Sequence, residues 1–369
     1  SPITFKAGGF DLAFTGEAIP PPETADAAAP KTDAWKIDVH LEKPTLVSPE
    51  RVFEEPVKVD EAIFQGRLLN TLGKFVVDRF TLEGPDLHAG LTASAQLRDD
   101  VRVAYELVTH DTAIAKLARL WPTHVAPPVR AWFVEHISKG FLKTAKCAGE
   151  FDDAALVAMR YERPPPDDAV RVDGEVVDAT VVDVVPGMPS ITDVSGTLHV
   201  TGRTATFLAQ SAILESAPGR RLTLKDARFA IPDNAIRPTP AQLDIDVSGN
   251  VEAVADVLNV PAIAKYASIP VQAENIKGQL AGRLHLDFEV GFDARDDQTK
   301  FTIDATTTNL VVDKLIGKER LDNGTLHVLA SPDGLHVTGN GRIFGAPSTL
   351  DLHRAFGEKG AAQAQMTLT

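Results

Sequence analysis

The chain has 369 residues, and its 44% hydrophobic and 24% charged content fits a folded chain with a core and excludes disorder. Its formal net charge is −14, so nucleic acid is not expected as a partner. The one cysteine, Cys147, excludes an internal disulfide framework. Because no run of about 18 apolar residues occurs, we expect neither a membrane-spanning helix nor an export signal within this chain.

Residues 1–110 are predicted to form an N-terminal β-strand segment, interrupted by a Pro/Ala-rich loop at 15–33. Over 35–42, apolar residues alternate with charged ones, which predicts a strand with one apolar and one polar face. The apolar members of this strand are Trp35, Ile37, Val39 and Leu41.

Residues 111–140 change from a period of two to a helical period. DTAIAKLARL (111–120) indicates a first helix. A second helix is predicted over about 128–138, because apolar residues recur there three and four apart between a Pro-Pro start and Gly140. We expect this pair to pack through Trp121, Trp132, Phe133 and Ile137. If Trp132 is fully buried, its truncation should cost roughly 3–5 kcal/mol. Arg130 should bind a carboxylate or carbonyl groups.

Residues 141–369 are interpreted as repeated β-hairpins with a short helical insertion at 251–268. Ser331-Pro332-Asp333-Gly334 separates two alternating runs and predicts a hairpin. Two further strands alternate clearly, and their apolar members are Leu243, Ile245, Val247, Leu284, Leu286, Phe288 and Val290. Antiparallel sheets with one polar face typically show this pattern.

Motifs for catalysis are not found. There is no Gly-rich phosphate loop, no nucleophile elbow and no HExxH motif, and the histidines are scattered, mostly at outward positions of strands. The carboxylate pairs Asp244/Asp246 and Asp152/Asp153 could serve a calcium or acid–base site, but acidic residues on a wet strand face need no such role. We therefore expect no enzyme activity, no cofactor and no metal site.

One stretch resembles a known family. WPTHVAPPVRAWFVEHISKGF has the form WP-x-x-x-A-P-x-x-R-x-W-x-x-x-x-I-x-x-G, which is similar to a segment of the AsmA-like bacterial envelope proteins, in the YhdP-like branch and related in type to TamB. MPSITDVSGTLHVTGRTATF, IKGQLAGRLHLDFEV and GLHVTGNGRIFGAPSTLDL also resemble that branch. The matching positions are Trp121, Pro122, Ala126, Pro127, Arg130, Trp132, Ile137 and Gly140.

The resemblance implies an elongated antiparallel β-sheet curled into an open groove or trough, and a function in bridge-like lipid transport. The apolar strand residues named above would line the groove and shield phospholipid acyl chains between the inner and outer membranes. The expected location is the periplasm, with anchoring to the inner membrane by an N-terminal helix outside this chain. Membrane contacts through neighbouring segments and envelope protein partners are further expectations.

Two alternatives remain open at the level of sequence. Alternation along strands is equally compatible with a closed sandwich or barrel core. The chain could then be a structural or scaffolding β-domain that binds protein partners during envelope or outer-membrane assembly and carries no lipid. The helix pair could cover an end of the groove, or it could pack on the sheet for stability alone.

Overall fold

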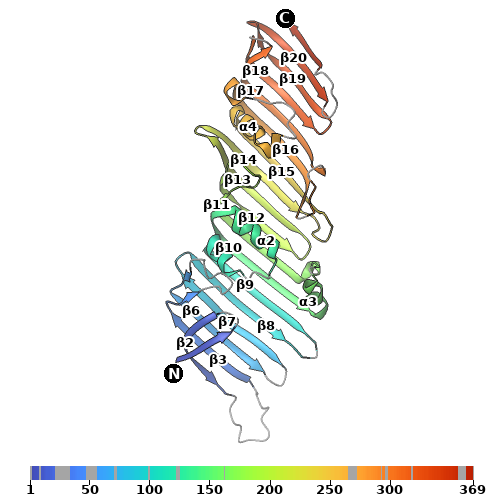
Figure 1. Cartoon of the computed structure of the whole chain (residues 1–369). Coiled ribbons are helices and arrows are strands. Elements are labelled where there is room, and N and C mark those ends of the chain that lie inside the picture. The colour runs from blue at the N-terminus through green and yellow to red at the C-terminus, as the bar shows by residue number, and fades with distance from the viewer. Residues whose placement is uncertain are drawn as a thin grey trace. The chain divides into compact units, whose positions relative to one another are not determined.

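The computed structural model describes residues 2–368 except 8–9, 21–33, 47–55, 70–72, 99, 122–124, 162, 265–271, 292, 296–297, 317–318 and 356–362. For 2–18, 316, 363, 364, 366 and 368 it describes the backbone alone. Strands account for 67% of the structure and helices are few. The strands form a large antiparallel sheet that is not closed into a barrel, which confirms the predicted fold class (Figure 1).

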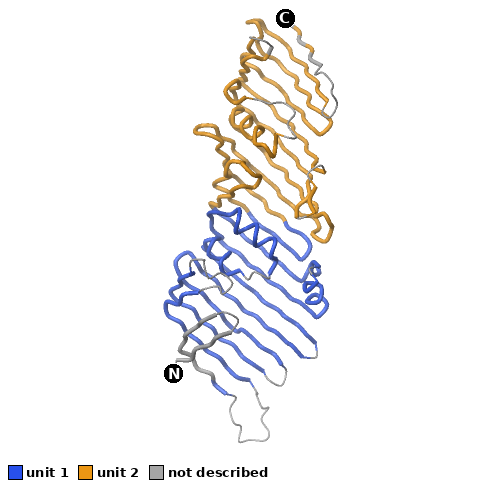
Figure 2. Tube along the Cα trace, in the orientation of Figure 1, with its two compact units in different colours: residues 1–177, 197–205 blue, residues 178–196, 206–369 orange. Residues whose placement is uncertain are grey.

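The chain divides into two compact units, which are coloured separately in Figure 2. The first unit comprises residues 1–177 and 197–205, and the second comprises 178–196 and 206–369. Three strands contribute residues to both units, namely β11 (Val170–Val181), β12 (Ile191–Thr201) and β13 (Ala205–Ala217).

In the first unit, each main strand pairs antiparallel with the next one along the chain. The strands are β1 (Pro2–Ala7), β2 (Phe10–Ile19), β3 (Ala34–Glu42), β6 (Glu61–Leu69), β7 (Lys74–Gly84), β8 (Leu87–Gln96), β9 (Arg102–Ala113) and β10 (Ile137–Asp152). A small ribbon joins β4 (Thr45–Leu46) to β5 (Val57–Lys58). The helices are α1 (Ile114–Leu120), α2 (Pro127–His136), α3 (Asp153–Arg160) and the 3₁₀ turn η1 (Asp167–Ala169).

The second unit repeats this antiparallel order from β14 to β21. Its strands are β13 (Ala205–Ala217), β14 (Arg220–Ile231), β15 (Thr239–Asn250), β16 (Ile276–Val290), β17 (Lys300–Ile316), β18 (Glu319–Ser331), β19 (Gly334–Ile343), β20 (Ala346–Ala355) and β21 (Gln363–Leu368). Its helices are α4 (Val251–Leu258), α5 (Pro261–Ala264) and the 3₁₀ turn η2 (Ala273–Asn275). Within the described ranges, no helix combines the length and apolar character needed to cross a bilayer.

The long strands contain β-bulges at residues that tolerate a left-handed backbone. The register shifts between Lys225 and Arg228, and here Asp226 has a φ of 47°. Asn309 and Asn323, with φ of 51° and 48°, lie at two further shifts in β17 and β18. Asp and Asn adopt this conformation more readily than other side chains with a Cβ. Each bulge inserts extra residues into one strand, and the paired residues on either side of it still point to the same faces of the sheet as their partners.

Most predicted elements are present, with corrections at their ends. The strand at 35–42 is β3, and the turn at 331–334 joins β18 to β19. The loop predicted at 15–33 begins too early, because Thr15–Ile19 pair with β3 as part of β2; residues 21–33 lie outside the described residues. Residues 111–113 end a strand instead of starting a helix, and residues 137–140, with Ile137, begin β10 instead of ending the second helix. The insertion at 251–268 consists of α4 and α5, with 265–268 outside the described residues.

Trp121 and Arg130, two residues of the segment that carries the resemblance, link α1 to α2. The Nε of Arg130 donates a hydrogen bond to the carbonyl oxygen of Trp121 at 3.0 Å, as the expected carbonyl contact. Trp121 follows the last residue of α1, so the cationic side chain lies where the helix dipole is negative. The indole Nε1 of Trp121 donates to the carbonyl of Val125 at 2.8 Å, and its ring lies 6.0 Å from that of Phe133. Arg130 is buried, which makes this contact structural.

Trp132 is not fully buried, so the condition attached to the predicted cost of its truncation is not met. Its side chain is 42% exposed, and its ring contacts those of Phe133 and His136 at 5.7 and 5.2 Å. The apolar residues of α2 are spread around the helix, so Val129, Trp132 and Val134 all remain exposed while Phe133 is half-buried. The ring of Trp132 therefore contributes less to stability than a buried tryptophan does.

We expect Trp132→Ala to lower the free energy of unfolding by about 1–2 kcal/mol, below the roughly 3–5 kcal/mol typical of a buried tryptophan. Trp121→Ala should cost more, because it removes both the indole hydrogen bond and the contact with Phe133. Urea unfolding of both variants measures the difference. Equal losses, or a larger loss for Trp132→Ala, would contradict this assignment.

Candidate functional site

The sheet has one apolar and one polar face, and β17 shows the alternation most clearly. Phe301 and Ile303 are half-buried and Ala305 and Thr307 are buried, whereas Thr302, Asp304, Thr306 and Thr308 are exposed. Successive side chains of a strand point to opposite faces, so consecutive inward residues lie about 6.8 Å apart along one side. The apolar face is the candidate functional site, because its members line up from strand to strand.

In the first unit, register places apolar residues opposite one another across six strands. Each directly paired couple lies on the same face, so a chain of pairings traces a row at right angles to the strands. The best-aligned row consists of Val39, Phe64, Phe80, Leu91, Leu107 and Cys147. All six side chains are half-buried. The row therefore remains in partial contact with its surroundings.

The second unit has an equivalent row across seven strands. It consists of Leu224, Val247, Gly282, Ala305, Val328, Val337 and Leu352. Leu224 and Ala305 are buried, and the other five residues are half-buried. No charged or amide side chain interrupts it.

The lengths of these rows can be compared with a lipid chain. Neighbouring strands lie about 4.8 Å apart, so six strands span about 24 Å and seven span about 29 Å. A lipid leaflet contributes about half of a hydrocarbon core of about 30 Å, that is about 15 Å. Each row is therefore long enough for the acyl chain of a membrane lipid.

Helices and the small ribbon cover the ends of the apolar face. At one end in the first unit, Val57 and Val59 join Leu82 and Leu87 in a buried cluster, with Leu120 of α1 packed against it. Phe151 of β10 and Ala155 of α3 form a cluster at the other end of the strands. In the second unit, Val251 of α4 packs into a cluster with residues that include Leu310, Leu321, Leu326 and Ile343. The rows adjoin these clusters, because Phe80 packs against the cluster around Leu82 and Val337 packs against the cluster around Val251.

The predicted lining residues share the apolar face. Ile37, Val39 and Leu41 are half-buried on one face of β3, and Trp35 shares that face but is 39% exposed. On β15 and β16, Leu243 lies opposite Leu286 and Ile245 lies opposite Leu284. Val247, Phe288 and Val290 share the same face. The β3 residues belong to the first unit and the remaining residues to the second.

Several residues of the rows are not recognisable from the sequence pattern. Phe80 lies in a strand with a bulge, because β7 contains an extra residue opposite both β6 and β8. The extra residue breaks the period of two, and the alternation in KFVVDRFTLEG is then difficult to recognise. Phe64 and Leu91 lie opposite Phe80 on the two neighbouring strands.

The polar face carries histidines paired with carboxylates from neighbouring strands. His40 contacts Glu61, and His199 contacts Asp173, each at 2.7 Å. His285 contacts both Asp244 at 2.9 Å and Asp287 at 3.1 Å. These histidines face outward as predicted, and a carboxylate partner accompanies each one. The carboxylate of Asp244 is the main cause that raises the pKa of His285, and Asp287 adds to it.

The other polar candidates have structural partners. Asp152 accepts a hydrogen bond from the backbone N–H of Ala155 at 2.8 Å and thereby caps α3, a helix that the sequence pattern did not predict. Asp246 lies 3.9 Å from Arg283. Cys147 lies on β10 beside the hydroxyl of Tyr105, and burial raises the pKa of its thiol. None of these contacts requires a catalytic role.

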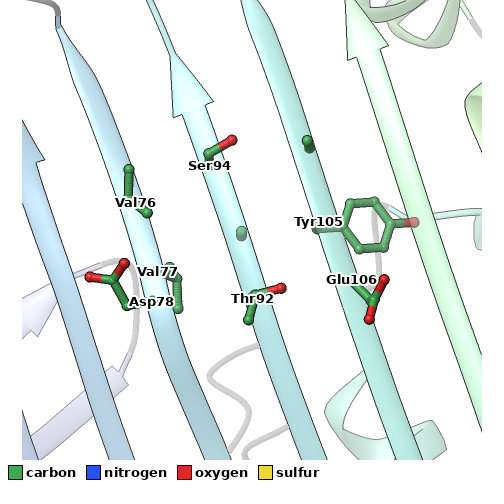
Figure 3. Close-up of a pocket in the computed structure, with 9 residues that line it drawn as sticks. Val76, Val77, Asp78, Thr92, Ser94, Tyr105 and Glu106 are labelled. Atoms are coloured by element: carbon green, nitrogen blue, oxygen red, sulfur yellow. The ribbon is translucent and has the colours of Figure 1, made fainter.

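A shallow hollow of about 410 Å³ lies over β7, β8 and β9 (Figure 3). Thr92, Ser94 and Glu106 line it from the polar face, together with Val76 and Asp78. It is wide open, and its lining combines short and charged side chains with the ring of Tyr105. We therefore place the candidate site on the opposite, apolar face.

Comparisons with known proteins leave the family open. Neither the family models, nor the curated proteins, nor the solved structures contain a match to this chain. The function is therefore inferred from the geometry of the sheet and from the sequence motifs.

We expect the stability contributed by His285 to depend on pH. Its pKa is raised in the folded protein, so its contribution is fully present below the unfolded value of about 6.5 and is lost as pH rises through the folded pKa. Urea unfolding should therefore show a larger difference between wild type and His285→Gln at about pH 5.5 than at about pH 8.5. In an Asp244→Asn background most of this pH dependence should disappear. A difference that is the same at both pH values would refute the assignment.

Proposed function

We propose that the chain is a segment of a periplasmic, bridge-like lipid-transport protein that shields phospholipid acyl chains against the apolar face of its sheet. The observation that carries this proposal is the row of apolar residues that continues from strand to strand in each unit. An acyl chain has no hydrogen-bonding groups, so it requires a path without unpaired polar side chains. Both rows meet this requirement.

Partial burial of the row residues favours a surface that binds a ligand over a closed core. A residue in a closed core is packed on all sides, as Leu321 and Ile343 are in the cluster beneath α4. The residues in the middle of the rows are mostly half-buried. Contiguous apolar surface of this kind marks sites that bind ligands, membranes or partner proteins.

The proposed location rests on the family resemblance. On that basis we place the chain in the periplasm between the inner and outer membranes, with an inner-membrane anchor outside this chain. Neighbouring segments would continue the groove toward both membranes. The competing function is a scaffolding β-domain that binds envelope proteins through the same face and carries no lipid.

Extraction of the purified protein tests the proposal. Organic solvent should release phospholipid, identified by mass spectrometry, at a molar ratio to protein that survives washing and size-exclusion chromatography. A cytosolic protein of similar size, purified alongside, controls for carried-over membrane. Protein free of lipid that instead co-purifies with a defined envelope protein would favour the scaffold.

The period of two in β16 gives a sharper prediction. A photoreactive side chain at Leu286 or Phe288 should crosslink to phospholipid, whereas the same group at His285 or Asp287 should not, because neighbouring residues face opposite sides. The paired positions share a strand and differ in face alone, so each serves as the control of the other. Crosslinking without regard to parity would refute a groove on this face.

A charge on the apolar face should interrupt the path without unfolding the protein. Phe288 is half-buried, with its ring 6.4 Å from that of Phe229, so a carboxylate introduced there can remain hydrated. We expect Phe288→Asp to fold, by circular dichroism, and to retain less lipid than wild type. Placing acyl chains beside that carboxylate would require its desolvation, which costs several kcal/mol. Unfolding of this variant would indicate a closed core.

A further inference from the structure

We propose that His336, Asp351 and His353 on the polar face form a binding site for a divalent transition-metal ion, for which Zn²⁺ is the best-suited probe. His336 belongs to β19 and the other two residues belong to β20. His336 and His353 are direct partners in the register of this strand pair. Asp351 is two residues from His353 and therefore points to the same face. The backbone thus brings three donors together without a loop.

The donor atoms lie at separations that suit one ion. The Oδ1 of Asp351 is 3.0 Å from the Nε2 of His336 and 3.3 Å from the Nε2 of His353. All three donor atoms lie within 4.8 Å of one another. In a tetrahedral zinc site with bonds of about 2.0–2.1 Å, the ligand atoms are about 3.3 Å apart. An ion between these donors therefore requires small side-chain movements, with a fourth position left for water.

The second histidine distinguishes this cluster from the other pairs on the polar face. His327 contacts Asp304 at 2.7 Å, and His40 contacts Glu61 at the same distance, each as a single pair. Within the described part of the chain, His336, Asp351 and His353 are the one group of three that satisfies the geometry of a metal site. Two imidazoles with one carboxylate suit zinc and its neighbours in the transition series, whereas calcium and magnesium prefer oxygen donors.

The two rings present their Nε2 atoms to a single carboxylate oxygen. The imidazoles are stacked with centroids 3.6 Å apart and planes inclined by 20°. Both rings approach the same oxygen of Asp351, which accepts hydrogen bonds but donates none when ionised. One metal ion would replace the protons between the rings and the carboxylate and satisfy all three groups.

The side chains are free to make the required adjustment. Nearly parallel rings must tilt apart so that both Nε2 lone pairs point to one ion. The side chains of His336, Asp351 and His353 are 37%, 50% and 60% exposed, so rotation meets little packing resistance. The bound ion would link β19 to β20 on the face opposite the apolar row. The site is thus independent of whether that row holds lipid.

Titration of the untagged, chelator-treated protein with Zn²⁺ tests the proposal. Isothermal titration calorimetry should show one ion per chain, and Co²⁺ should give the visible absorption of a tetrahedral site. His353→Asn and Asp351→Asn should each weaken Zn²⁺ binding at least about tenfold, since loss of a ligand should cost no less than loss of a group that merely orients one. His327→Asn, on the same face of the neighbouring strand, should bind like wild type.

The outcomes separate the site from adsorption to scattered histidines. Absence of saturable binding in the wild type would overturn the proposal, and so would undiminished binding in His353→Asn. Equal weakening by His327→Asn would also overturn it, because binding would then be unspecific. Circular dichroism of each variant confirms folding. If His353→Asn fails to fold, His336→Asn replaces it with the same expected loss.

Discussion

Register between neighbouring strands is the constraint on which the rest of the structure depends. A slip of one residue would move every apolar side chain of a strand to the polar face. The pairing of Val247 with Gly282, and of Gly282 with Ala305, shows how each strand fixes the face of the next. Asp226 and Asn323 extend this control through the bulges, because their left-handed backbones absorb extra residues where the register shifts. The local backbone conformation therefore determines which side chains lie on each face of the sheet.

This arrangement places most of the buried apolar side chains outside the two rows. Buried side chains such as Leu82, Leu87, Leu321 and Ile343 gather where helices or the small ribbon cover the strand ends. Burial of this kind contributes about 1.5–3 kcal/mol for each large apolar side chain. Apart from Leu224 and Ala305, the residues of the rows are half-buried and contribute less. Their composition can therefore serve a ligand while the ends supply much of the stability.

Local pattern was sufficient to predict the strands with unbroken alternation, the turn before Gly334 and the presence of helices near 114–136. It was insufficient wherever the outcome depended on a partner far along the chain. Trp132 has helical spacing typical of a buried residue, yet its exposure depends on what lies beside α2. The short helix α3 has too few residues to display a period, although Asp152 is a recognisable cap.

The other features that the sequence did not predict also depend on pairing between strands. His336 and His353 are remote in sequence, and their meeting requires the register of β19 and β20. The prediction that no metal site exists relied on sequence motifs, and cross-strand donors leave no such motif. The lining of the apolar face was predicted for β3, β15 and β16, but its continuity requires pairings that a single strand does not reveal.

Glycines determine how deep the apolar face can be at its centre. At Gly282 a Cβ would come within 2.5 Å of the Cα of Ala305, so no larger residue fits without moving the neighbouring strand. These two small residues lie in the middle of the row in the second unit, with Leu280 and Leu284 on either side along β16. In the first unit, by contrast, the ring of Tyr105 lies over Gly149. A low centre between leucines would suit the extended apolar chain of the proposed function, and a chain held there would stabilise the folded state to a degree that rises with its affinity and concentration. Under that proposal, filling of the row and stability of the sheet are coupled.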